Sequence, residues 1–373
     1  MPETNDDSHE VREPGAAAGP RRAWVWLRAR PLWKLVCAGL ALMVGLVAVT
    51  GWLAYRKIDG NIRTDEATAA ALAEHGAARP ARHPGQALNI LLLGSDWRQA
   101  AGSERSDTVM LLHLAADRKR AEVLSVPRDL RVDMPSCLRS DGEYSLAQNA
   151  QFNWAFQFGG AACTIRTLEK LTGIRIDHHL TVDFKGFTKI VNAVGGVEVD
   201  VKRPEHDPNV GLDLNAGKHL LQGEQALGYV RARKYVGDGS DLNRIERQQD
   251  FVNRLAEKIR SNGTLANPAR LYPVLDAATS ALTADAGLDS LSELYGLADD
   301  LRGLPPGALT FTTLPNQESD HWYRLDLEQP EARRVFEAVK KDQPVARALA
   351  AARKEPDEEP DEPEYEPVHD EYE

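Results

Sequence analysis

The chain has 373 residues, 42% of them hydrophobic, and a formal net charge of −11 at pH 7. This length accommodates one large domain or two small ones, and the composition is ordinary for a globular core. The acidity belongs to the C-terminal end, because the residues from 355 onward include eleven Asp and Glu and no Lys or Arg. The remainder balances near zero, so it lacks the basic field that would predict nucleic acid as a partner.

An apolar segment near the N-terminus is predicted to cross a membrane once. Residues 35–55 contain no charged side chain and provide about the 20 residues that a spanning helix needs. Trp33, Trp52 and Tyr55 lie at its ends, where aromatic rings favour the membrane interface. Arg and Lys are frequent just before the segment, so we expect residues 1–34 to be a disordered cytoplasmic leader and the chain after the anchor to be extracytoplasmic. These residues are Arg21, Arg22, Arg28, Arg30 and Lys34. The alternative, a cleaved signal peptide, would have a shorter apolar core.

The rest of the chain is predicted to form one folded domain, preceded by a stalk and followed by a disordered tail. Residues 56–86 resemble an extracytoplasmic stalk with an Ala-rich helical piece, and folded structure is expected over 87–345. Residues 346–373 are dominated by Glu-Pro and Asp-Glu-Pro units and should form a disordered acidic tail.

Strands and helices alternate within the predicted domain. Apolar runs that end at polar turns predict strands over 87–93, 108–114, 121–126, 180–184, 197–201 and 308–314. Helices are predicted over 147–158, 161–171, 187–194, 223–232, 241–261 and 330–345, and again between 268 and 302. The pattern indicates an α/β fold, an αβα sandwich with a central mixed sheet, preceded by one transmembrane helix.

Two cysteines, Cys137 and Cys163, lie in the part of the chain expected outside the cell, whereas Cys37 lies in the apolar segment. In an oxidising compartment two cysteines most simply form one disulfide, and two buried free thiols are the alternative.

Acidic side chains flank two of the predicted strands. Asp96 follows the first strand and Asp107 precedes the second, so both carboxylates are expected at one edge of the sheet. Mg²⁺ in proteins takes one or two carboxylates together with substrate phosphates and water, and Mn²⁺ is an alternative. Arg105 and Arg128 are expected on the same rim, where guanidinium groups suit bidentate contacts to phosphate oxygens.

Further basic groups are predicted at the ends of two helices. Arg231 and Arg233 can face one ligand only if the helix that carries Arg231 ends there. Arg244 and Gln248 are four residues apart on one helical face, and Asp241 lies one turn before Arg244. The clusters together indicate pyrophosphate chemistry at a membrane surface.

The order of these motifs resembles the LytR-CpsA-Psr family of ligases, which attach glycopolymers to bacterial cell walls. The resemblance covers residues 89–259, with weaker similarity to about residue 340, and rests on segments 105–108, 125–129, 156–160, 182–187, 195–197, 221–227, 231–233 and 247–249. It implies transfer of a phosphoglycan from a polyprenyl-pyrophosphate lipid to a hydroxyl of peptidoglycan. It also implies an apolar tunnel for the lipid tail between the sheet and the helices.

The resemblance implies a role for individual residues as well. Asp96 and Asp107 correspond to Mg²⁺ ligands, and Asp241 matches an acidic position beside the pyrophosphate. The predicted pyrophosphate-binding residues are Arg105, Arg128, Arg231, Arg233, Arg244 and Gln248. The role of Arg131 stays open, and Asp129 and Asp241 are both candidates for the group that accepts the proton of the acceptor hydroxyl. Two alternative functions are a polyprenyl-pyrophosphate pyrophosphatase and a non-catalytic scaffold for lipid-linked intermediates.

Overall fold

The computed structural model describes residues 25–95, 106–261, 267–320 and 324–352. Residues 1–56 and 57–373 form two compact units, each described by itself. The first contains most of helix α1 (Val25–Asp59), of which Trp33–Asp59 is long and apolar enough to cross a membrane. The large apolar side chains from Trp33 to Tyr55 are exposed, in agreement with the predicted anchor. Most of the predicted leader and of the acidic tail lies outside the described residues.

The second unit is built on a mixed sheet whose described strands follow the order β1-β12-β7-β2-β3-β4-β13. At its centre, β2 pairs with β3 and β3 with β4 in antiparallel register, while β2 is parallel to β7. The strands predicted over 108–114 and 121–126 are therefore confirmed, and they form a hairpin. The strands are β1 (Arg63–Thr64), β2 (Leu88–Ser95), β3 (Ser106–Leu114), β4 (Ala121–Val126), β7 (His178–Asp183), β12 (Leu282–Ala284) and β13 (Leu309–Thr313).

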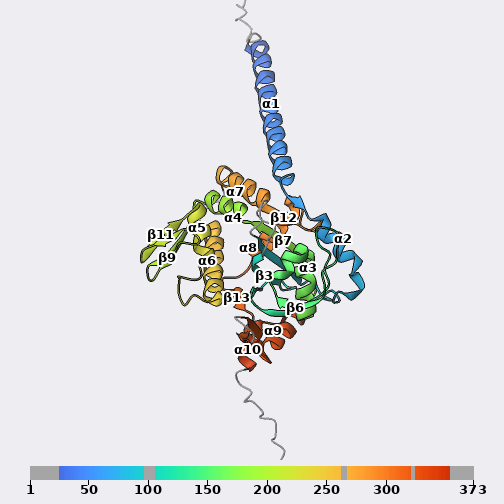
Figure 1. The fold of residues 1–373 in the computed structure, drawn as a ribbon. Helices are drawn as coiled ribbons and strands as arrows, with labels where there is room; N and C mark the ends of the chain where they lie inside the picture. Colours follow the sequence, from blue (N-terminus) through green and yellow to red (C-terminus); the bar gives the residue numbers. More distant parts are fainter. Residues whose placement is uncertain (1–24, 96–105, 262–266, 321–323, 353–373) are drawn as a thin grey trace, which may run out of the picture. The chain divides into compact units, whose positions relative to one another are not determined.

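Helices cover both faces of this sheet and complete the predicted αβα sandwich (Figure 1). Alternate residues of a strand point to opposite faces, so Leu91 and Leu111 pack toward one helical layer while Ile90 and Leu112 pack toward the other. The first layer consists of α2 (Glu66–Glu74), α3 (Trp154–Thr172), α9 (Glu331–Lys340) and α10 (Val345–Ala352). On the second face lies α8 (Leu291–Arg302).

A smaller cluster of elements has its own core around the buried Phe251 and lies beside the sheet. It comprises α4 (Phe184–Ala193), β8 (Val197–Val201), β9 (Glu205–Asp207), β10 (Leu212–Leu214), β11 (Gly217–Leu221), α5 (Gly223–Arg231) and α6 (Asp241–Ser261). Helix α4 also packs closely on α7 (Pro268–Ala281), because Gly186 has no side chain to hold Ala281 away. The remaining short elements are η2 (Gly76–Ala78), β5 (Arg131–Met134), β6 (Gln148–Gln151), β14 (Asn316–Glu318) and β15 (Leu325–Leu327).

Ordered structure extends beyond the predicted domain limits at both ends. In the segment predicted to be a stalk, β1 pairs with β12 of the central sheet and Leu72 of α2 is buried in the core. Past residue 345, α10 packs Ala348 and Leu349 against the same core. Both additions are short pieces that gain their order from contacts with distant parts of the chain, which local sequence patterns do not reveal.

Two helices predicted over 147–158 and 161–171 differ from the observed elements. Residues Gln148–Gln151 form β6 instead, because they pair with β5, and α3 then runs from Trp154 with a kink at Gly159 and Gly160. Gly173 ends α3 in the left-handed conformation, which favours glycine.

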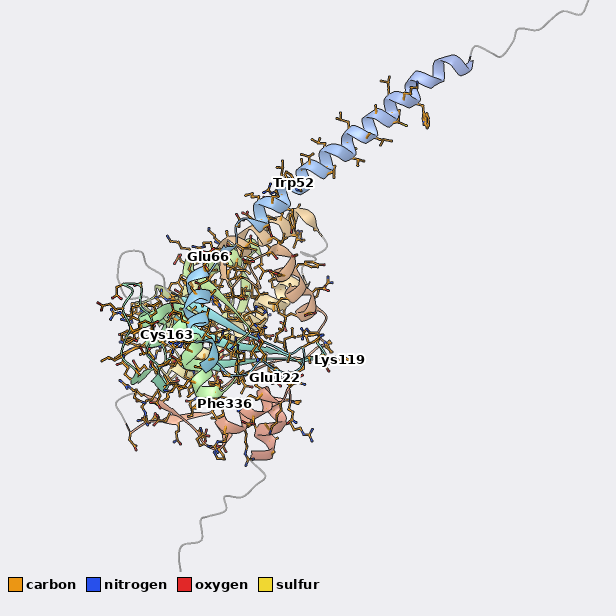
Figure 2. The ribbon with its side chains drawn as sticks, turned by 90° about the vertical axis from the view of Figure 1, so that its right-hand side faces the viewer. Trp52, Glu66, Lys119, Glu122, Cys163 and Phe336 are labelled. Atoms are coloured by element: carbon orange, nitrogen blue, oxygen red, sulfur yellow. A yellow bond between two sulfur atoms is a disulfide. The ribbon has the colours of Figure 1, made fainter. Side chains whose placement is uncertain are left out.

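The predicted disulfide between Cys137 and Cys163 is present, and it joins the loop after β5 to α3 (Figure 2). The disulfide fits beside the kink of α3 because Gly159 has no side chain. A side chain at Gly159 would lie 2.9 Å from Cβ of Cys163 and 2.8 Å from the carbonyl oxygen of Leu138. Gly160 has a φ of +58°, which favours glycine at this position. The kink and the disulfide thus fix the segment that follows β5.

Candidate functional site

Those predicted site residues that the structure describes lie around one edge of the central sheet. Strand β2 ends there at Ser95, β3 begins at Ser106, and β4 ends at Val126. At the same edge β7 ends at Asp183, which pairs in register with Ser95. We call this edge, where β7, β2 and β4 end and β3 begins, the catalytic edge.

A β-bulge occupies the middle of the catalytic edge. Gly94 pairs with Thr108 and Ser95 with Ser106, so Asp107 is the extra residue on β3. The buried Ser106 hydroxyl lies 3.1 Å from the carbonyl oxygen of Gly94 and 3.0 Å from that of Thr108, and it thereby fixes the bulge. Bulges often redirect a side chain at a functional site, and this one falls on a residue predicted to bind Mg²⁺.

Two basic residues enclose the carboxylate of Asp241 beside the bulge. Oδ1 of Asp241 lies 2.7 Å from Nη2 of Arg244 and 3.2 Å from Nε of Arg128. The side chains of Asp241 and Arg244 are each only 3% exposed, and that of Arg128 is 20% exposed. Removing charges from water is unfavourable unless opposite charges compensate, so Asp241 serves first to hold the two guanidinium groups in place.

A second carboxylate, Asp129, links this group to α5. Its Oδ2 lies 3.3 Å from Nη2 of Arg233, and its Oδ1 lies 3.8 Å from Nε of Arg128. Burial and the nearby negative charge of Asp241 raise the pKa of Asp129, although the surrounding arginines oppose the shift. Among the described residues, three guanidinium groups and two carboxylates therefore form one continuous cluster, and its arginines suit an anionic ligand.

Helix α5 ends at Arg231, as predicted, and the side chains of Arg231 and Arg233 then point in different directions. Between them the buried Ala232 leaves the helical conformation, with a ψ of 135°. The guanidinium of Arg231 then lies 4.4 Å from the ring centre of Phe184, at the start of α4, while Arg233 reaches Asp129. Arg231 thus lies on the β7 side of the bulge and Arg128 on the β4 side, so cations flank it from two directions.

Gln248 lines a crevice beside Arg244, but its amide is engaged within the protein. The Nε2 of Gln248 donates a hydrogen bond to the carbonyl oxygen of Val230 at 3.0 Å. The crevice is too narrow to admit a water molecule. It is lined by Thr108, Val109, Met110, Ser125, Val126, Arg244, Ile245 and Gln248. It lies between the sheet and α6, and the lipid tunnel that the resemblance implies there stays a prediction.

Two positioning residues on α6 were absent from the predicted site. Nη1 of Arg247 donates to the carbonyl oxygen of Ala232 at 2.5 Å, and Gln249 donates to the hydroxyl of Ser125 at 2.8 Å. Together with Gln248, these residues tie α6 to α5 and to β4. A signal was available in the sequence, because residues 247–249 form one of the segments on which the family resemblance rests.

Arg131 lies apart from this cluster. Its guanidinium forms two hydrogen bonds to the carboxylate of Asp326 on β15, at 2.7 and 2.9 Å. This bidentate pair joins β5 to β15, and Arg131 therefore has a structural contact of its own.

The predicted metal ligands can be tested only in part. Asp96 and Arg105 lie outside the described residues, and for Asp107 only the backbone is described. Among the residues that are described, no three His, Cys, Asp or Glu side chains are grouped to hold a metal. The bulge does place Asp107 on the strand next to the one that leads into Asp96, which fits a pair of carboxylate ligands.

A sheet edge with clustered arginines is suited to a phosphorylated ligand. The family comparison points to a particular class of protein. The LytR_cpsA_psr family matches residues 55–341, and the chain belongs to this family.

Named relatives act in cell-wall assembly. The cell wall biosynthesis protein LcpA of Corynebacterium glutamicum is 31% identical over 76% of this chain and 60% of its own length. The polyisoprenyl-teichoic acid–peptidoglycan teichoic acid transferase TagU of Halalkalibacterium halodurans is 32% identical over 56% of this chain and 64% of its own. The chain thus spans less than two thirds of the length of these curated relatives.

Solved structures share the fold. The LytR-Csp2A-Psr enzyme from Actinomyces oris has 25% identity and a TM-score of 0.56, with 70% of this chain and 93% of that chain covered. TagT bound to LIIa-WTA has 27% identity and a TM-score of 0.52, with 69% and 91% covered.

Proposed function

We propose that this protein is a membrane-anchored phosphotransferase that moves a phosphoglycan from a polyprenyl-pyrophosphate carrier to a hydroxyl of peptidoglycan. The observation that supports it most strongly is the cluster of Arg128, Arg233 and Arg244 at the catalytic edge. Family membership and the transferase name of TagU support the same reaction. The excess of Arg and Lys before the apolar segment supports an extracytoplasmic domain, where peptidoglycan is found.

The guanidinium groups bind the pyrophosphate and offset the charge that grows on it during transfer. Arg128, Arg231, Arg233 and Arg244 approach the anion from both sides of the bulge, and Gln248 fixes the end of α5. Their planar forks match phosphate oxygens in a bidentate manner, and Arg105 is proposed to bind the pyrophosphate as well. Because ion pairs already hold Arg128, Arg233 and Arg244, little reorganisation is needed as the transition state forms.

In the transfer step the acceptor hydroxyl attacks the phosphorus atom that bears the glycan. A new oxygen–phosphorus bond forms, the bond to the bridging oxygen breaks, and polyprenyl phosphate leaves with the bonding electrons. The hydroxyl proton goes to Asp129 in this proposal. Asp129 is better suited than Asp241, since its pKa is raised and its side chain is 13% exposed against 3% for Asp241.

A divalent cation completes the proposed site. Asp96 and Asp107 would hold Mg²⁺, or alternatively Mn²⁺, beside the pyrophosphate. When bound, this ion would supply further neutralisation of the leaving oxygens. The arginines bind and orient the pyrophosphate.

The test uses purified full-length protein in detergent with a lipid-pyrophosphate glycan donor. Release of polyprenyl phosphate that depends on added peptidoglycan, with glycan joined to the acceptor, is the expected result. Release at the same rate without acceptor would instead establish a pyrophosphatase. Donor binding without any release would establish the scaffold. A chelator should abolish turnover, and added Mg²⁺ should restore it.

A further inference from the structure

The chain enters the folded unit at a defined surface. Lys57 lies two residues after the apolar segment, so the membrane surface is within about 7 Å of it along the chain. Nζ of Lys57 lies 3.3 Å from the hydroxyl of Tyr272 and 3.4 Å from Oδ1 of Asp276, both on α7. Asn61 also donates to Asp276, at 3.0 Å. The residues that leave the membrane are therefore fixed to α7.

This entry point lies at the catalytic edge and away from the opposite edge of the sheet. Strand β12 follows α7 and begins beside Val182, near the end of β7. Arg63 of β1 lies 3.6 Å from Asp183, which ends β7 and caps α4. The turn that contains Lys119, between β3 and β4, marks the far edge. Folding thus brings the end of the anchor and the proposed active site to the same edge.

The surface formed by α4 and α7 at this edge has the chemistry of a membrane interface. The two helices lie side by side (Figure 1), and the close approach of Gly186 to Ala281 joins them. Lys185 and Lys189 are exposed and four residues apart, so they share one face of α4. We define the α4/α7 surface as Lys57, Lys185, Lys189, Arg270 and Tyr272.

Charge at this surface favours an anionic partner. The nearby carboxylates of Asp183 and Asp276 each already face a cation, Arg63 and Lys57 respectively. The exposed Lys185 and Lys189 of α4 add positive charge to this surface. Aromatic rings such as that of Tyr272 favour the headgroup level of a bilayer, and basic residues are attracted to anionic lipids there.

We propose that the α4/α7 surface docks onto the anionic headgroups of the membrane that holds the anchor. Docking places the catalytic edge at the bilayer surface, and Arg231, stacked on Phe184 at the start of α4, lies between this surface and the arginine cluster. A pyrophosphate lipid then reaches the site without leaving the membrane. The inference rests on the membrane anchorage in the proposed function and not on the transferase chemistry.

The experiment measures the distance of α4 from the lipid in the full-length chain. A fluorophore is attached at Thr188→Cys in a Cys37→Ser background, and a reference is attached at Lys119→Cys on the far edge. Nanodiscs contain phosphatidylcholine alone or with phosphatidylglycerol, plus a lipid whose headgroup quenches the fluorophore. Strong quenching at position 188 that increases with phosphatidylglycerol, and weak quenching at 119, is expected. Equal quenching at both positions would overturn the proposal.

Charge reversal provides the matched comparison. Lys185→Glu with Lys189→Glu should weaken docking by roughly thirtyfold or more, since two attractions to the anionic surface are lost and two repulsions are added. The same charge change at Lys340→Glu with Lys341→Glu, at the end of α9, should leave quenching unchanged. In the unsubstituted protein, added salt should also reduce quenching, because exposed charges are screened. Quenching that is insensitive to the α4 reversal and to salt would refute electrostatic docking.

Turnover of a short-chain donor in detergent, measured in parallel, reports failure of the transferase proposal separately.

Discussion

Removal of the disulfide should destabilise the folded unit by an amount that its loop length predicts. The bond between Cys137 and Cys163 spans 26 residues, and both cysteines are buried with Met134, Ala150 and Ala155. The loss of loop-closure entropy in the unfolded chain for this length corresponds to about 3.5 kcal/mol. For a folded unit of this size, that change lowers the unfolding midpoint by about 7 °C.

The measurement is thermal unfolding of full-length protein in detergent, for the natural chain and for Cys137→Ala with Cys163→Ala. A reductant should lower the midpoint of the natural chain toward that of the double variant and leave the variant unaffected. The loop after β5 and the first turns of α3 should also exchange amide hydrogens faster. A midpoint shift below about 1 °C, or a natural chain that is insensitive to complete reduction, would refute the reasoning.

Three other substitutions test separate parts of the structure. Asp129→Asn should lower kcat by about 10²- to 10⁴-fold with little change in KM. In the unsubstituted protein, the rate of transfer should rise as pH increases through the raised pKa of Asp129. A rate that does not depend on pH would exclude Asp129 as the proton acceptor. The hydrogen bond to Asp285 raises the pKa of His178. The stability lost in His178→Asn should therefore be largest below about pH 6.5 and should vanish as pH rises through the raised pKa. Urea unfolding at several pH values measures this loss. Gly186→Ala places its Cβ 2.4 Å from that of Ala281 and should cost about 1–3 kcal/mol, whereas Gly296→Ala, with nothing within 4 Å, should not destabilise.

The central strands and the basic motifs were predictable because their signals are local. The apolar run before Gly94 and the polar turn at residues 117–120 are sufficient to define β2 and the hairpin. The apolar face of α6, with Ile245 among its members, predicts the bounds that the structure shows. Polar residues at the ends of such elements meet at one edge, which explains why Arg128 and Arg244 could be grouped in advance.

Elements that depend on distant partners were not predictable. The two residues of β1 are a strand only because β12 lies beside them, and Gln148–Gln151 resemble a helix until β5 pairs with them. The different contacts of Arg231 and Arg233 follow from the backbone turn at Ala232, whose direction depends on packing against neighbouring elements. Tertiary contacts override local preference in each case.

The most direct test of the central claim is the effect of arginine-to-lysine substitution on glycan transfer. Arg128→Lys keeps the charge beside Asp241 but loses the planar fork, so we expect glycan transfer to peptidoglycan to fall by roughly 10²-fold or more. Arg118→Lys is the matched control. Arg118 lies in the turn at the far edge, where it pairs with Asp300 of α8, so this variant should retain activity. Mass spectrometry of the peptidoglycan product quantifies transfer for each protein. Full transfer by Arg128→Lys, or equal loss in both variants, would contradict the assignment of the pyrophosphate to the catalytic edge.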